Sequence, residues 1–493
     1  MKPTVRIFTL LLSLLLLCTC FAACNGDKDE PDADTDTQTE LPDETEEPEL
    51  SLSFPKENNN NTAINILMST SLGYEIATEA SSDRVEGAMF ERNCDVEEYL
   101  GVVLNIIPRD GGWATRTEFN NLIQISAMSS KEFDVAQNEI SASYRANAIA
   151  GYYKNVNDIP TLDLSSPWWL ENMTENYGFD NTLYGILGDS SLSLYKEMNV
   201  LYFNRHLIDQ YKLDNPYDLV RDKKWTLETM LNMAVGVKED IDGDYDITQN
   251  MMGYVAAAVA NRAWLTALDI TLINQNTETG ALTVASAPSE KLIKVFDLMY
   301  DKFENNDNLY VEDSGEYLEI FANNNALFAL GFFEDVEKFR DMEYDYGLVP
   351  MCMWEGQDDY ISPISTWAGM WYVLTNTEKA DLVGKTLDAL AFYGHRDVIP
   401  EYYEIALGLT YARDENVQEM LSIMREKAVL SFDSVYAASF SPSMYNILQM
   451  SEGFRNPPSD KTTTRHGANI TTFWATNQTM WNLAAQKLYG QLS

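Results

Sequence analysis

The alternation of strand-like and helix-like segments after residue 62 is the feature that most restricts the fold of this chain. Apolar strand-like runs cover residues 63–68, 102–107 and 133–136, with helical patterns over 85–100 and 119–128 between them. This order and spacing predict βαβ crossovers and a parallel sheet, hence an α/β fold. Because ligands of such sheets bind beyond the carboxyl ends of the strands, we expect the loops 69–75 and 137–141 to lie at a binding edge.

Length and charge narrow the class of protein further. The chain has 493 residues, and 76 Asp and Glu against 34 Lys and Arg give a formal net charge of −42. This length predicts two or more lobes, each with its own core. The negative charge would repel phosphates and argues against nucleic-acid binding. The sequence has three histidines, too few to suggest a His-rich zinc site.

The first 24 residues have the pattern of a bacterial lipoprotein signal peptide. Lys2 and Arg6 precede a short apolar run, and residues 21–24, which end at Cys24, are similar to a lipobox. We expect acyl chains such as palmitate on Cys24 and a place at the outer face of the bacterial cell membrane, because two such chains suffice for stable anchoring. Plain secretion without acylation is the alternative.

An acidic spacer is expected between this anchor and the folded body. Residues 25–50 are rich in Asp and Glu and contain no aromatic side chain, so they cannot bury enough apolar surface to fold. We therefore predict a disordered tether over residues 25–61. No later apolar run is long enough to cross a bilayer, so the lipid is the expected membrane contact. Cys94 and Cys352 could form a disulfide or remain free thiols.

Six later segments form an ordered set of motifs. They are YYKNVNDI at 152–159, LYGILGD at 183–189, NVLYFNR at 199–205, KWTLETM at 224–230, FANNNALFALG at 321–331 and YGLVPM at 346–351. In this order they resemble the extracellular solute-binding proteins of sugar-type ABC importers, the family of the maltose-binding protein. The resemblance covers residues 62–493. It departs from the family pattern at Asn325, where glycine is usual.

The resemblance implies a two-lobed periplasmic-binding-protein-like fold, in which hinge crossings join the lobes and an interlobe cleft closes on the ligand. The first α/β lobe would comprise residues 62–188 plus 351–430, and the second would comprise 189–350 plus 431–493. It also implies a monomer that captures a carbohydrate, with an oligosaccharide favoured, and delivers it to the permease subunits of an ABC transporter.

The candidate ligand-binding residues are aromatic and polar side chains near the predicted strand ends and crossings. Aromatic faces stack on sugar rings, while carboxylates and amides form hydrogen bonds with hydroxyl groups. The aromatic candidates are Phe333, Trp367, Trp264, Trp371 and Trp113, and the polar candidates are Ser71, Glu75, Asn138, Glu139 and Asp189. For each of them, packing in the core or a solvated position on a loop is the alternative.

One acidic loop is a candidate metal site. Asp240, Asp242, Asp244 and Asp246 alternate along the chain and could hold a Ca²⁺ ion, whereas Tyr245 stands where an EF-hand requires glycine. A standard EF-hand is therefore excluded, and a plain acidic loop is the alternative. No other cofactor is expected.

Two further functions stay open beside capture for import. A surface glycoside hydrolase would use two carboxylates, but so acidic a chain supplies such pairs by chance. A lipid-anchored glycan-binding protein could also work without any transporter. The sequence contains no GxSxG, HExxH or phosphate-loop motif, so we expect no enzymatic activity.

Overall fold

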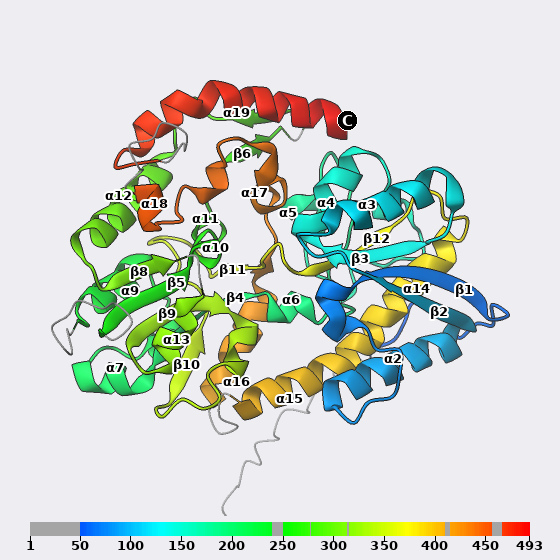
Figure 1. Cartoon of the computed structure of the whole chain (residues 1–493), viewed down its shortest axis with the longest axis horizontal. Coiled ribbons are helices and arrows are strands. Elements are labelled where there is room, and N and C mark those ends of the chain that lie inside the picture. Colours follow the sequence, from blue (N-terminus) through cyan, green and yellow to red (C-terminus); the bar gives the residue numbers. More distant parts are fainter. Residues whose placement is uncertain (1–49, 239–249, 277, 313–314, 410–414, 456–465) are drawn as a thin grey trace, which may run out of the picture. The chain divides into compact units, whose positions relative to one another are not determined.

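The computed structural model describes residues 50–238, 250–276, 278–312, 315–409, 415–455 and 466–493 (Figure 1). The predicted signal peptide, Cys24, the tether up to residue 49 and Asp240, Asp242, Asp244 and Asp246 lie outside the described residues. Among the helices that are described, none is long and apolar enough to cross a membrane.

Residues 51–61 lie against the first long helix of the folded body. Phe54 is buried, and its carbonyl accepts a hydrogen bond of 2.8 Å from the hydroxyl of Tyr99. Glu57 forms an ion pair of 2.5 Å with Lys385. Residues 51–61, which the sequence analysis assigns to the tether, are therefore held on the body by an apolar side chain and a partnered carboxylate.

The first sheet contains the strands that the sequence predicts at the start of the body. Its order within the described residues is β12 (Gly369–Val373), β3 (Val135–Glu139), β1 (Thr62–Ser69) and β2 (Val102–Arg109). Strand β1 pairs in parallel with both β2 and β3, and β12 pairs antiparallel to β3. The predicted βαβ crossovers are confirmed, with α2 (Arg84–Leu100) and α3 (Arg116–Ile125) as their helices.

Local sequence signals set the ends of α2. The side chain of Asp83 accepts hydrogen bonds from the backbone N–H groups of Val85 and Glu86, which satisfies two donors of the first turn. Gly101 ends the helix with φ +61°, a left-handed conformation that glycine adopts without a Cβ clash. Strand β2 can therefore begin directly at Val102.

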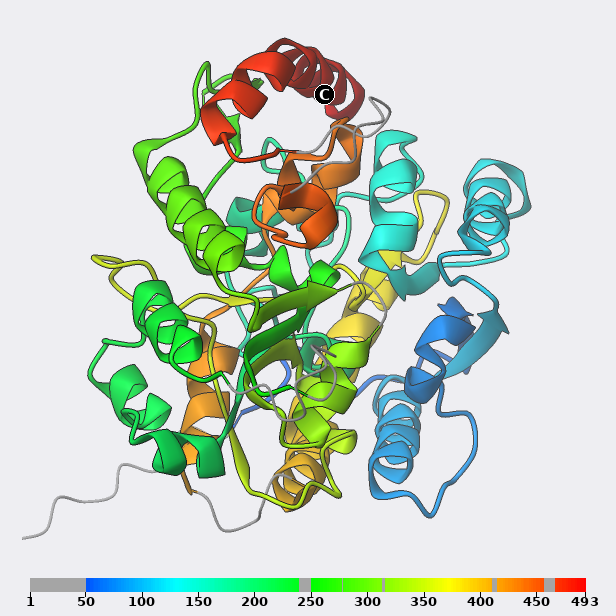
Figure 2. The ribbon, with the colours of Figure 1, turned by 60° about the vertical axis from the view of Figure 1, so that its left-hand side comes forward.

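The second sheet mixes parallel and antiparallel pairs. Its order within the described residues is β10 (Tyr346–Val349), β4 (Asn199–Asn204), β9 (Ala326–Phe332), β5 (Met252–Ala257) and β8 (Leu309–Glu312). Strands β4 and β9 are buried at every position, as expected where both faces of a sheet are covered. The two sheets lie in different halves of the ribbon in both views (Figures 1 and 2).

Helices cover both sheets and complete the chain. The longer ones are α4 (Ile140–Ile149), α9 (Leu227–Val235), α12 (Glu290–Asn305), α14 (Ala380–Tyr393), α15 (Ile399–Leu409), α16 (Glu415–Glu426) and α19 (Ile470–Leu492). The shorter ones are α5 (Met173–Tyr177), α6 (Ser193–Lys196), α7 (Arg205–Tyr211), α8 (Pro216–Arg221), α10 (Ala258–Asn261), α11 (Trp264–Ala267), α13 (Glu316–Ala322), α17 (Phe432–Tyr436) and α18 (Glu452–Arg455).

Two linking segments pass between the sheets. The first runs through α6, from Asp189 to the start of β4, and the second spans residues 350–368, from the end of β10 to the start of β12. Within the second link, β11 (Ser362–Pro363) pairs in parallel with β13 (Ala428–Val429). Residues 183–189 stay beside the first sheet, where Ile186 forms a β-bridge with Trp371.

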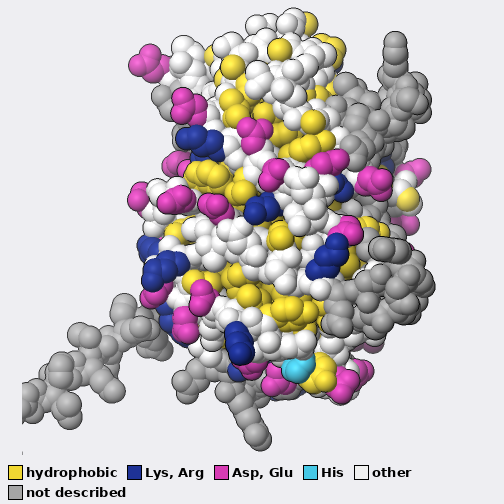
Figure 3. All heavy atoms as spheres, turned by 90° about the vertical axis from the view of Figure 1, so that its left-hand side faces the viewer, with side chains coloured by type: hydrophobic (Ala, Val, Ile, Leu, Met, Phe, Trp, Pro, Cys, Tyr) yellow, Lys and Arg dark blue, Asp and Glu magenta, His cyan; other side chains and the backbone are white. Residues whose placement is uncertain are grey.

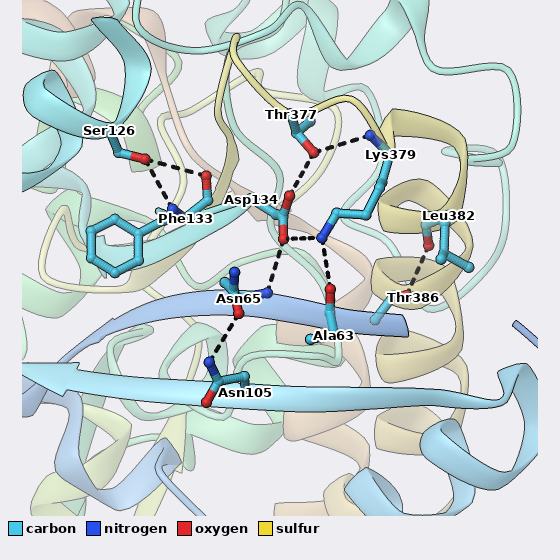
Figure 4. A network of polar contacts seen from close by, with 10 residues as sticks. All are labelled: Ala63, Asn65, Asn105, Ser126, Phe133, Asp134, Thr377, Lys379, Leu382 and Thr386. Carbon is cyan, nitrogen blue, oxygen red and sulfur yellow. Dashed lines mark hydrogen bonds and ion pairs between the residues drawn. The ribbon is translucent and has the colours of Figure 1, made fainter. Parts of the chain in front are cut away.

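A buried carboxylate ties the first sheet to the segment before α14. The carboxylate of Asp134 accepts hydrogen bonds from Thr377 Oγ1 at 2.8 Å, Lys379 Nζ at 2.7 Å and the backbone N–H of Asn65 at 3.0 Å (Figure 4). Lys379 Nζ also donates to the carbonyl of Ala63 at 2.7 Å. This network joins β1 to residues far along the sequence, and its charges are all compensated.

Charged side chains of both signs are interspersed on the described part of the face in Figure 3, with apolar side chains between them. Exposed ion pairs, such as Arg221 with Glu419 at 2.6 Å, are common in the chain. Each contributes only about 0–1 kcal/mol, because water screens the charges. The buried core, rather than surface charge, therefore stabilises the fold.

Candidate ligand-binding cleft

A cleft of about 860 Å³ lies between loops that follow strands of both sheets. The first sheet contributes the loop after β1 and the segment where β3 leads into α4. The second sheet contributes the segments after β5 and β9. The loops 69–75 and 137–141 thus supply lining residues, as the sequence predicts. The volume is typical of a site for a small organic ligand.

An aromatic pair forms one part of the cleft wall. The rings of Phe332 and Trp367 lie 5.4 Å apart between centroids, at an interplanar angle of 38°. Phe332 is buried, whereas Trp367 is 41% exposed and presents a free ring surface. The backbone N–H of Trp367 donates to Ser365 Oγ at 3.1 Å, which fixes the turn that carries the ring.

Three glutamates line the same cleft, and we call Glu139, Glu197 and Glu334 the acidic cluster. Glu197 is only 7% exposed, and among the described residues no hydrogen-bond partner contacts its Oε2 atom. Burial raises the pKa of Glu197 to about 8, and repulsion from Glu334, Asp335 and Glu139 adds to this. A buried carboxylate without a full set of partners is costly, so this group is suited to contact with a ligand.

One cation stands beside the acidic cluster. Lys196 Nζ lies 3.4 Å from Glu334 Oε2 and 3.4 Å from Glu337 Oε1. It also lies 4.9 Å from the ring centroid of Tyr74, which lines the cleft. The ammonium group therefore compensates Glu334 directly, whereas its influence on the pKa of Glu197 is weaker than those of burial and of the neighbouring carboxylates.

A second buried polar side chain follows Glu197. Asn199 lines the cleft and is 2% exposed, and among the described residues its Nδ2 atom has no hydrogen-bond partner. The segment 197–199 thus places two side chains on the cleft wall that each have an enclosed polar atom without a partner in the described residues.

The cleft also contains positive charge. Arg145 of α4 and Arg262, which follows α10, both line it. Burial lowers the pKa of Arg145, although the guanidinium group stays charged at any physiological pH. Tyr445 and Asn446 line the cleft as well. The walls therefore combine aromatic faces, acids, bases and amides.

The structure brings part of the predicted site together. Trp367, Trp113, Glu139 and Ser71 all line the cleft. Trp113 is 59% exposed, and the guanidinium of Arg116 lies 3.9 Å from its ring centroid. Their contact with a ligand stays a prediction, which their position supports.

Three predicted aromatic residues are not on the cleft wall. Trp264 is completely buried, and its Nε1 donates to Asn261 Oδ1 at 3.0 Å. Phe333 is buried with its ring 5.8 Å from that of Tyr402 between centroids. Trp371 is buried within β12. Each points into packed protein, because it lies within a buried helix, strand or turn rather than on the exposed loop beside it.

Three predicted polar residues are also enclosed by protein. Glu75 accepts a hydrogen bond from the backbone N–H of Ser193 at 2.8 Å, and Asn138 donates to the carbonyl of Gly111 at 2.9 Å. Asp189 is paired with Arg425. All three are buried, and none lines the cleft. In this structure they hold loops and links in place.

The prediction missed several lining residues, among them Tyr74, Glu197, Asn199, Phe332, Glu334 and Arg262. One signal was available for two of them. Glu197 and Asn199 stand at the amino end of β4, which runs antiparallel to β9, so they lie at the same sheet edge as the carboxyl end of β9, where ligands of α/β sheets bind. The others lie one or two positions from residues that were chosen.

The described residues contain two cysteines and no candidate metal site. Cys94 is exposed on α2 and Cys352 is buried after β10, and both are free thiols. Within the described ranges, no group of His, Cys, Asp and Glu side chains could hold a metal ion.

Comparisons with known proteins identify the fold. No family model matches the sequence, and no curated protein sequence matches it either. An ABC transporter solute-binding protein from Agrobacterium radiobacter K84, solved in complex with ribitol, is similar in structure at 11% identity and a TM-score of 0.50, over 87% of this chain and 100% of that chain. UgpB from Mycobacterium tuberculosis, in complex with glycerophosphocholine, is similar at 11% identity and a TM-score of 0.53, over 86% and 98%.

At such low identity, these similarities establish the fold and leave the ligand open. The chain has the two-lobed α/β fold of solute-binding proteins, which confirms the predicted fold class. The lobe boundaries at 188, 350 and 430 stay predictions.

Proposed function

We propose that this protein is a binding protein that captures a carbohydrate, with an oligosaccharide favoured, in the cleft and delivers it to the permease subunits of an ABC importer. The observation that carries the proposal is the exposed ring of Trp367 beside buried, partly unpartnered polar groups in one cleft. Sugars need both features, because their C–H faces stack on aromatic rings while their hydroxyls require hydrogen-bond partners. Ribitol, the ligand of one similar structure, is a sugar alcohol.

A calorimetric titration with di- to hexasaccharides tests the proposal. We expect at least one saccharide to bind without being cleaved, and Trp367→Ala to lose about 1–3 kcal/mol of binding free energy, the scale of a buried aromatic contact. Met480→Ala is a matched control, because Met480 is an exposed apolar residue of α19 outside the cleft. Binding of a short peptide and of no sugar would overturn the ligand class.

A glycoside hydrolase is the second candidate, and one observation favours it. Glu139 and Glu197 line the same cleft, and the raised pKa of Glu197, about 8, is a property of a general acid. The similar structures are of a solute-binding protein and of UgpB, which favours binding. Product analysis after long incubation with the tightest saccharide separates the two functions, because a binding protein returns the ligand intact.

Anchoring and partners are part of the same proposal. A chain that captures a ligand for import works outside the cell membrane, and acyl chains on Cys24 would keep it there. Cys24→Ser is expected to release the protein from the membrane fraction, and retention of the variant would refute the anchor. A glycan-binding protein without a transporter would be indicated if deleting the gene of this protein left the uptake of its tightest-binding saccharide unchanged.

Calcium binding by Asp240, Asp242, Asp244 and Asp246 also stays a proposal. If these carboxylates hold Ca²⁺, a chelator lowers the melting temperature of the native chain, because a ligand of the folded state stabilises it by mass action. The double variant Asp242→Asn, Asp244→Asn would then melt at the same temperature with and without the chelator.

A further inference from the structure

The acidic cluster contains one buried carboxylate, that of Glu197, which lacks a full set of hydrogen-bond partners and lies among other carboxylates. Glu197 is more than nine-tenths buried and lines the cleft, and in the described part of the chain its Oε2 has no partner. The charged neighbours that most affect it are the carboxylates of Glu334, Asp335 and Glu139, followed by the ammonium group of Lys196. Carboxylates therefore outnumber cations among these neighbours.

The other members of this neighbourhood do not remove the excess. Asp335 accepts hydrogen bonds at its Oδ2 atom from the backbone N–H of Phe332 at 2.8 Å and from Tyr317 Oη at 2.9 Å, and neither donor carries a positive charge. Lys196 is shared between Glu334 and Glu337. Arg145 and Arg262 also line the cleft, but burial and neighbouring carboxylates dominate the pKa of Glu197. A cation of the ligand beside Glu197 would therefore favour its charged form, since buried charges need an opposite charge as well as hydrogen bonds.

We propose that the acidic cluster binds a protonated amino group of the ligand, so that the captured carbohydrate is an amino sugar or an oligomer that contains one. This inference rests on the proposed function and names the substrate class of the same cleft. Trp367 supplies a flat surface for the sugar ring beside the cluster, and the Nδ2 atom of Asn199 can donate to a neighbouring hydroxyl.

Other occupants fit the cluster less well. A neutral sugar hydroxyl could form a hydrogen bond with Glu197, but unlike an ammonium group it would not favour the charged form of this carboxyl group. A divalent metal ion needs several ligand groups gathered at one point, and no such group occurs in the described part of the chain. The formal charge of −42 adds a long-range field that attracts cations and repels anionic sugars.

The test compares saccharides that differ only at one substituent. Tetramers of β-1,4-linked glucosamine, N-acetylglucosamine and glucose carry an ammonium, an amide and a hydroxyl group at the same ring position. The pairs glucosamine and glucose, galactosamine and galactose, and mannosamine and mannose extend the comparison to other rings. Each is titrated calorimetrically at pH 6.5 into the full chain.

We expect at least one amino sugar to bind tenfold or more tightly than its neutral counterpart. Glu197→Gln, which keeps the shape of the side chain, should reduce this ratio to about two or less, and Glu139→Gln should reduce it about threefold. Glu132→Gln, on an exposed loop outside the cleft, should leave the ratio unchanged. Melting curves of each variant confirm that it is folded.

The possible failures can be told apart. If neutral sugars bind and no amino form binds more tightly than its counterpart, the inference is overturned while the proposed function stands. A preference for amino sugars that persists in both Glu197→Gln and Glu139→Gln would also overturn it, because another group would then be the site. If no saccharide of either kind binds, both the proposed function and the inference fail.

Discussion

Asp189 and Glu197 are two buried carboxylates on the same link between the sheets, and their surroundings differ. Asp189 accepts hydrogen bonds from Tyr195 Oη at 2.5 Å and from Arg425 at 3.1 Å, and its other oxygen lies 2.6 Å from His395 Nδ1. Glu197 faces three further carboxylates, and its Oε2 has no partner in the described residues. Burial alone therefore does not identify a ligand contact, whereas incomplete compensation within a cleft does.

The largest expected effect concerns Asp189, the carboxylate whose charge is compensated within the protein. Asp189→Asn should lower the free energy of unfolding by about 3–5 kcal/mol, because it leaves the partly buried guanidinium of Arg425 without its counter-charge. Urea unfolding followed by circular dichroism measures the loss. A change below about 1 kcal/mol would show that the pair is exposed to water in solution and is not a structural element.

A tryptophan pair extends the comparison to apolar side chains. Trp264→Phe should lower the free energy of unfolding by about 1–3 kcal/mol, because it removes volume and a hydrogen bond from a closed core. Trp367→Phe should change it by less than about 0.5 kcal/mol, because the ring of Trp367 is exposed. The same urea titrations serve for both variants, and equal losses would contradict the assignment of only one of them to the cleft.

The last prediction concerns the pH dependence of stability at Glu197. Between about pH 4.5 and pH 8 the folded chain keeps a proton on Glu197 that the unfolded chain has lost, since burial raises the pKa in the folded state to about 8. Because the folded chain binds one more proton than the unfolded chain in this window, the free energy of unfolding falls as the pH rises through it. Glu197→Gln has no such proton and should gain stability relative to wild type from pH 5 to pH 8, by at most about 1.4 kcal/mol for each pH unit.

Urea midpoints at pH 5 and pH 8 check this expectation. The control is Glu132→Gln, for which the difference from wild type should stay constant between the two values. A Glu197→Gln variant that lost stability relative to wild type on going to pH 8 would mean that Glu197 is already compensated by a cation in the native protein.

Much of the fold could be predicted from the sequence, because local signals set it. The apolar run that forms β1, the capping residue Asp83 and the helix-ending Gly101 all act through neighbours in the chain. The motif order then indicated two lobes. The packing of residues 51–61 on the body was not predicted, since the contact of Phe54 with α2 depends on residues far away in sequence.

The site was predictable only in part, for a physical reason. Whether an aromatic residue faces the cleft or the core changes between neighbouring positions, as Phe332 and Phe333 show: the first lines the cleft and the second packs on Tyr402. The sequence gives the loop but not this choice, which tertiary packing decides. The partners of Asp189 come from α16 and from the segment before α15, so its compensation could not be seen in the sequence.

A structure of the protein with its tightest-binding saccharide tests the central claim most directly. We predict a sugar ring on the exposed face of Trp367, with a nitrogen or oxygen of the ligand within hydrogen-bond distance of Glu197 Oε2 and with the contacts of Asp189 unchanged. A saccharide bound away from the cleft, or one that leaves Glu197 without a contact, would contradict the account.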